Sequence, residues 1–166
     1  MNNKYNNYNI GNTKLQDAKL FYSAIIMSIA HYIGILAYNP YSPLLVTTYI
    51  VGSITSILNH YFNKHEIIHE GFMHLDRIVM IIGFFVDLYF IRLIYLTSKN
   101  RQVVKLILIL LFVTICIYFN SLYHKENIRH MGYRMHQLIH IIVTLVHLIM
   151  LKELNMIHSC CPVKTI

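Results

Sequence analysis

A long uncharged stretch near the start of the chain limits what it can fold into. Between Leu20 and Asn63 the sequence contains no Asp, Glu, Lys or Arg, and this stretch is about twice the roughly 20 residues that cross the hydrocarbon core of a bilayer as a helix. Two prolines, Pro40 and Pro43, divide it near its middle. Proline lacks an amide donor and biases the preceding residue away from helix. The stretch therefore predicts two membrane spans joined by a short turn.

The composition extends this prediction to the whole chain. Of the 166 residues, 56% are hydrophobic and only 13% are charged, and the mean hydropathy is +0.50. These values are too apolar for a soluble domain of this length. We expect an all-α, polytopic transmembrane helix bundle over residues 20–152, with about five spans. The predicted spans lie near residues 20–38, 44–62, 78–97, 103–119 and 135–151.

The two ends of the chain are expected to lie outside this bundle. Residues 1–19 are rich in Asn and Tyr and lack the residue order of a cleavable signal peptide, so they predict a disordered polar tail. Residues 153–166 predict a C-terminal tail. With five spans, eight of the 14 Lys and Arg residues fall on the side of the N-terminus. This bias predicts a cytosolic N-terminus.

The net charge of +7 indicates which partners suit the chain. The basic residues are spread along loops and tails, without the basic helix or the interleaved aromatic residues of a nucleic-acid surface. Attraction to anionic lipid headgroups explains them better. We therefore expect membrane lipids as partners and no nucleic acid, and we also allow for a homo-oligomer, because five helices are few to enclose a lipid chain.

Polar residues gather where three of the predicted spans meet one side of the membrane. Ser56 and His60 end the second span at spacing i and i+4, Asp76 opens the third, and His136 and His140 open the fifth at spacing i and i+4. This spacing places two side chains on one helical face, and two imidazoles so placed can share a tetrahedral metal. Five further histidines fall on the same side: His65, His69, His74, His124 and His130.

These motifs resemble the signature of the CREST superfamily of membrane hydrolases, which includes alkaline ceramidases, progestin and adiponectin receptors and haemolysin III-like proteins. The resemblance covers the second, third and fifth spans, and this chain has about five spans where family members have about seven. It implies a Zn²⁺ ion bound by three histidines, with a serine and an aspartate assisting a metal-bound water that cleaves lipid amides or esters. On this chain the implied metal ligands are His60, His136 and His140, and the implied catalytic pair is Ser56 and Asp76.

Three other functions stay open. His65-Glu66-Ile67-Ile68-His69 matches the H-E-x-x-H motif of membrane metalloproteases, although we expect this segment to be a short polar loop rather than a long helix. A di-iron desaturase also gathers about eight histidines, but the chain has no His-x-x-His-His sequence. The third alternative is a non-catalytic membrane scaffold or accessory protein, whose histidines titrate between about pH 5 and 8.

Three ionisable residues lie deep in the predicted spans. His31 and His147 sit on otherwise apolar spans, and we expect them to form interhelical hydrogen bonds rather than to bind metal. Asp87 lies in the middle of the third span. A carboxyl group at that depth stays protonated, pairs with a cation such as Arg92, or lines a water-filled cavity.

Overall fold

In the computed structural model the chain forms five long helices. The structure describes residues 3–38, 42–62, 66–98, 100–127 and 129–160, although not the side chains of residues 3–17, 66–69, 122–127, 129–130 and 160. Within these ranges there is no strand. The helices are α1 (Asn3–Tyr38), α2 (Pro43–Tyr61), α3 (Glu66–Thr97), α4 (Arg101–Asn127) and α5 (Arg129–Cys160). The predicted all-α helix bundle is confirmed.

Four of the helices are long and apolar enough to cross a membrane. Their candidate spans are Ala18–Tyr38, Glu70–Thr97, Arg101–Ser121 and Met131–Ser159. The helix α2 has 19 residues and includes Ser53, Thr55, Ser56 and Asn59, all of which are buried. These polar residues lower its hydropathy but face the other helices. The predicted span near 44–62 is thus a helix of the bundle, although it is not among the four candidate spans.

The helices α1 and α2 end and begin on either side of the predicted turn, at Tyr38 and Pro43. The side chain of Ser42 accepts a hydrogen bond from the backbone amide of Leu45 at 3.3 Å, and Pro43 occupies the first turn of α2. A serine cap followed by proline is a strong helix start, because the cap satisfies one free amide and proline has none to satisfy. Residues 39–41 lie outside the described residues.

Most helices extend further than the predicted spans. The structure has helix from Asn3 where the sequence predicts a disordered tail over residues 1–19, and α5 continues to Cys160 where it predicts a tail from residue 153. The three prolines of the chain lie at positions 40, 43 and 162, so nothing breaks the helices at the edge of the apolar segments. A helix, once formed, adds residues at little further cost.

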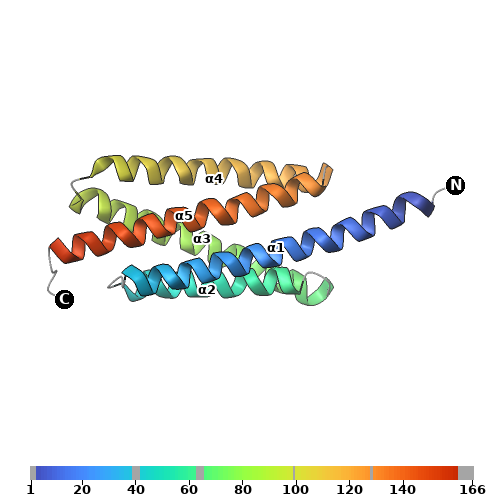
Figure 1. Cartoon of the computed structure of the whole chain (residues 1–166), viewed down its shortest axis with the longest axis horizontal. Coiled ribbons are helices and arrows are strands. Elements are labelled where there is room, and N and C mark those ends of the chain that lie inside the picture. Colours follow the sequence, from blue (N-terminus) through green and yellow to red (C-terminus); the bar gives the residue numbers. More distant parts are fainter. Residues whose placement is uncertain (1–2, 39–41, 63–65, 99, 128, 161–166) are drawn as a thin grey trace.

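The helices pack lengthwise, with α1 against α2 and α5, and α5 also against α3 and α4 (Figure 1). The apolar core lies toward the end where α3 finishes and α4 begins, and includes Leu45, Ile94, Ile107 and Met150, all fully buried. Gly34 lets α1 approach α5 closely there, since a Cβ atom at this position would collide with the Leu148 side chain.

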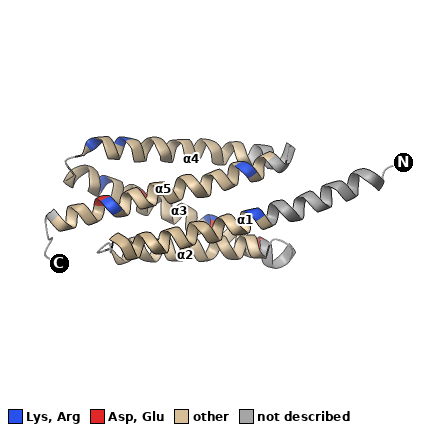
Figure 2. Cartoon of the chain, in the orientation of Figure 1, with Lys and Arg blue, Asp and Glu red and all other residues tan. Residues whose placement is uncertain are grey.

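The outer surface is apolar, and the basic residues lie toward its two ends (Figure 2). Large side chains such as Ile26, Phe85, Ile109 and Phe112 are each about 60% exposed or more. Apolar surface of this extent marks a membrane or protein interface rather than a surface in water. Among the described residues, three exposed basic side chains follow or precede the polar residues of three helices: Lys19 on α1, Arg77 on α3 and Arg134 on α5.

Candidate metal centre

Three predicted ligands meet at the end of the bundle away from the apolar core. His60 is near the end of α2, and His136 and His140 are in the second and third turns of α5. Each offers one ligand nitrogen, and these nitrogens lie within 4.8 Å of one another. At Zn–N bonds of about 2.0–2.1 Å, the ligand nitrogens of a tetrahedral site lie about 3.4 Å apart, so the rings would close by up to about 1.4 Å around a bound ion. The predicted convergence of these three histidines is confirmed, and the cluster could hold a metal ion.

The three imidazoles are packed edge to face around a common point. Their ring centroids are 5.0 Å apart for His136 and His140, 5.2 Å for His60 and His136, and 5.4 Å for His60 and His140. The interplanar angles are 64–85°. The backbones of α2 and α5 stay apart, with no Cα atoms within 8 Å among the described residues. Only the side chain of His60 therefore contacts α5, through the rings of His136 and His140.

Ser23 on α1 fixes the orientation of one ligand. Its hydroxyl donates to the carbonyl oxygen of Leu20 at 2.8 Å, and its oxygen lies 2.9 Å from Nδ1 of His140. Because a hydroxyl has a single proton, Nδ1 of His140 is the donor in the second bond. A neutral His140 then carries its lone pair on Nε2, which is the nitrogen left to bind a metal. An outer partner of this kind orients a metal-binding histidine and raises its basicity.

Asp76 is buried on α3, where this helix meets α2. The side-chain amide of Asn59 donates to its Oδ2 atom at 2.8 Å, and the hydroxyl of Thr55 lies 3.3 Å from Oδ1. Asp76 is not one of the three residues whose ligand atoms converge. The Oδ1 atom of Asn59 is itself buried, with no hydrogen-bond partner among the described residues. Such an acceptor suits a bound water or a substrate N–H.

Ser56 is the fifth predicted site residue. It is buried, at 6% exposure, on the face of α2 that carries His60 one turn later. Its position thus agrees with the predicted face, and its catalytic role stays a prediction.

The remaining histidines on this side are not all described. His74 is exposed on α3 and is not part of the converging group. His65 lies outside the described residues, and the side chains of His69, His124 and His130 are also outside them. The H-E-x-x-H segment is not a short loop as predicted, because α3 already begins at Glu66. The geometry that the protease alternative needs therefore falls outside the described part of the chain.

The sequence analysis missed Ser23, Thr55 and Asn59. Ser23 flanks the inward stripe of α1, whose buried members Leu20, Ala24 and Met27 follow at helical spacing, so the periodicity of the span could have identified it. Thr55 and Asn59 are four residues apart and share a face toward α3.

Comparison with known proteins adds no assignment to this geometry. No family model, no curated protein and no solved structure matches the chain. The candidate metal centre therefore depends on the residues of this chain alone.

Proposed function

We propose that this protein is a zinc-dependent hydrolase of amide or ester bonds in membrane lipids. The observation that carries the proposal is the convergence of His60, His136 and His140, with ligand nitrogens within 4.8 Å of one another. The resemblance of these motifs to CREST hydrolases supports the choice of reaction and of zinc.

The donor set fits a catalytic zinc site better than a structural one. Structural zinc sites are closed by four protein ligands, whereas catalytic sites have three and keep one position for water or substrate. Among the described residues three histidines converge, with no carboxylate or cysteine in the group. Imidazole ligands suit zinc, copper, iron and nickel, so the identity of the metal is part of the test.

The surroundings of the site suit a lipid substrate. The cluster lies at one end of a bundle whose outer surface is covered with large apolar side chains. Exposed basic residues are close in sequence to the site residues: Arg134 to His136, Arg77 to Asp76, and Lys19 to Ser23. An acyl chain can lie along the apolar surface while the polar linkage and the headgroup stay at the level of these residues. A soluble substrate would gain nothing from this arrangement.

Each residue of the site has a separate task in the proposed reaction. A bound zinc ion would supply a water activated for attack near neutral pH. Ser23 holds His140 in the tautomer that exposes Nε2. Asp76, held by Asn59, accepts the proton of the attacking water and later returns it to the leaving group. Ser56 donates a hydrogen bond to the carbonyl oxygen as negative charge develops there.

Lipid turnover by the purified full-length protein tests this proposal. Ceramide-like and acyl-ester lipids are supplied in mixed micelles, and metal content is measured on the same samples. We expect Ser56→Ala to keep the metal and to lose about 10²–10³-fold in kcat, as for removal of an oxyanion donor. Asp76→Asn should behave similarly, and His140→Ala should lose both metal and turnover.

Ser28→Ala is the matched control. Ser28 bonds to its own helix through the Ala24 carbonyl, so turnover should not change. Metal without hydrolysis of either lipid class would instead favour a non-catalytic membrane scaffold, and a His140→Ala variant as active as the parent would refute the proposal.

A further inference from the structure

A second polar group lies deeper in the bundle and links four helices. The Nε2 atom of His147 on α5 is 3.0 Å from Oδ2 of Asp87 on α3, and its Nδ1 atom is 2.9 Å from Nε2 of His31 on α1. On α2, Ser53 Oγ lies 3.3 Å from Nδ1 of His31, and the Tyr49 hydroxyl donates to Oδ1 of Asp87 at 3.4 Å. The predicted interhelical bonds of His31 and His147 are confirmed, and the partners of Asp87 are His147 and Tyr49 rather than Arg92.

The direction of these hydrogen bonds follows from counting protons. An ionised Asp87 has no proton, so Nε2 of His147 is the donor to it. The Nδ1 atom of a neutral His147 is then an acceptor, and Nε2 of His31 donates to it. By the same reasoning Nδ1 of His31 is an acceptor, and the hydroxyl of Ser53 donates to it. Each hydrogen bond in this row, from Ser53 to Asp87, is thus donated in the direction of Asp87.

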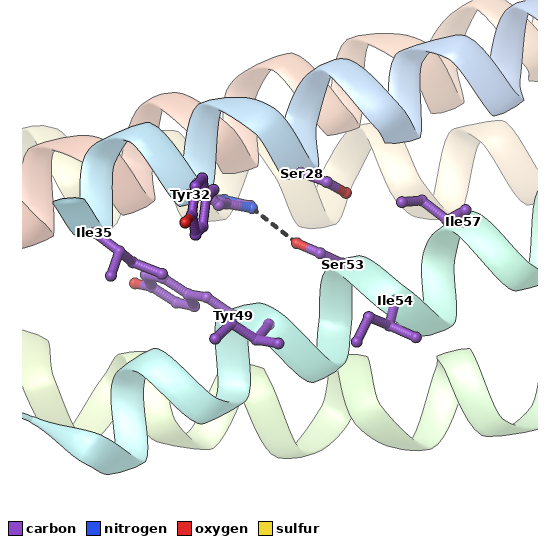
Figure 3. A pocket seen from close by; sticks show the side chains of 9 residues that line it. Ser28, Tyr32, Ile35, Tyr49, Ser53, Ile54 and Ile57 are labelled. Carbon is purple, nitrogen blue, oxygen red and sulfur yellow. Dashed lines mark hydrogen bonds between the residues drawn. The ribbon is translucent and has the colours of Figure 1, made fainter.

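The row of hydrogen bonds begins at a pocket and ends at a buried carboxyl group. A pocket of about 170 Å³ lies between α1 and α2, and His31 and Ser53 are among the residues that line it (Figure 3). Tyr32 and Ile54 on its wall are more than half exposed, so the pocket opens to the outside of the bundle. Both His31 and Asp87 are buried, at 4% and 5% exposure, but Asp87 is not among the residues that line the pocket.

The residues around His31, His147 and Asp87 pack against them and add no charged group among the described residues. The ring of Tyr49 stacks on His147 at 4.0 Å and on His31 at 5.3 Å between centroids. Among the described residues, the titratable groups that face these hydrogen bonds are Tyr49 on α2, Tyr32 on the pocket wall, and His140, seven residues before His147 on α5. The helix α4 packs against this region with apolar residues, Val104, Ile107 and Leu111.

We propose that His31, His147 and Asp87 form a proton-uptake path, which carries a proton from the pocket to Asp87. A weak acid in the pocket gives its proton to the Ser53 hydroxyl oxygen and is left as its conjugate base, while the hydroxyl proton of Ser53 passes to Nδ1 of His31. The proton on Nε2 of His31 moves to Nδ1 of His147, and the proton on Nε2 of His147 moves to Oδ2 of Asp87. Both imidazoles change tautomer and stay neutral, and the carboxylate becomes a carboxylic acid.

This order of proton transfers suits a low-dielectric interior better than a path through a charged histidine would. A charge buried among apolar side chains is costly unless it is paired and hydrogen-bonded. In the proposed path no imidazolium persists, no heavy atom has to move, and the loaded chain carries no net charge. If these hydrogen bonds only joined the helices, the two histidines would not need to exchange tautomers.

Spectroscopy on the full-length protein in lipid nanodiscs tests the path. Nitrogen-15 NMR of labelled histidines distinguishes Nδ1–H from Nε2–H, and infrared difference spectra detect the carbonyl stretch of a protonated carboxyl group. As the pH is lowered, we expect the carboxyl band of Asp87 to appear together with a switch of His31 and His147 from Nε2–H to Nδ1–H. Asp87→Asn should remove both the band and the switch.

Two variants separate relay from simple packing. His147→Gln keeps an amide donor for Asp87 but cannot exchange protons between two ring nitrogens, so His31 should keep its tautomer at every pH. Tyr49→Phe keeps the stacked ring and should retain the coupled switch. Helical circular dichroism checks the fold of each variant. A doubly protonated His31 or His147, unchanged tautomers while Asp87 protonates, or no change in either signal before the wild-type protein unfolds would each overturn the proposal.

Discussion

Two groups of histidines meet α5 in this bundle, and their neighbours differ. In the outer group, His60, His136 and His140 stand edge to face around one point, with a hydroxyl from α1 behind His140. In the inner group, His31 and His147 are joined nitrogen to nitrogen at 2.9 Å, and the row ends on a carboxylate. Convergent lone pairs suit a cation, whereas lone pairs used in a row of hydrogen bonds suit protons. The same residue type is thus set for two kinds of chemistry by the groups that surround it.

The largest effect should distinguish the two groups by metal content. We expect His136→Ala to abolish stoichiometric metal binding, since two imidazoles are left of three. His147→Ala, on the same helix, should retain the metal in full. Elemental analysis of the purified proteins after dialysis measures both. Equal loss in the two variants would show that the metal binds the inner group as well, and the comparison would fail.

The free energy of unfolding should fall more for a substitution in the inner group than for one in the outer group. His147→Ala leaves the buried carboxylate of Asp87 without its closest partner, at 3.0 Å in the structure, and loss of a hydrogen bond to a charged group costs about 1.5–3 kcal/mol. Replacing both residues, in Asp87→Leu with His147→Leu, should recover most of this loss because no unpaired charge remains. Denaturant unfolding in detergent, followed by circular dichroism, gives the free energies. A double variant that is as unstable as His147→Ala would contradict a buried Asp87 carboxylate that depends on the His147 hydrogen bond.

The smallest of the three effects concerns the hydroxyl behind His140. Ser23→Ala removes the acceptor at 2.9 Å from Nδ1 and frees the ring to turn or change tautomer. Loss of such an outer partner typically weakens metal affinity about 10–100-fold. Competition with a chelator measures the affinity, and the stoichiometry at saturating metal should stay the same. The hydrogen bonds of the inner group should not change, so the tautomers of His31 and His147 serve as the internal control.

Much of the fold follows from the sequence because the membrane imposes simple rules. Apolar stretches of sufficient length must become helices that satisfy their own backbone, and the segment between Asn39 and Pro43 had to break the first long stretch. The helix ends could not be predicted in the same way. Glu66 and Arg129 begin helices outside the apolar segments, where neither hydropathy nor proline marks a boundary.

The sequence by itself determined which residues could reach the outer site. Spacing i and i+4 put His136 and His140 on one face of α5, and the parity of the spans put His60 on the same side. Only the tertiary structure decided what surrounds them. Ser23, Asn59 and the partners of Asp87 come from other helices, and their contacts depend on how the helices are rotated and shifted against one another. Periodicity within one helix indicates an inward face, but the packing of all the helices decides which inward residues meet.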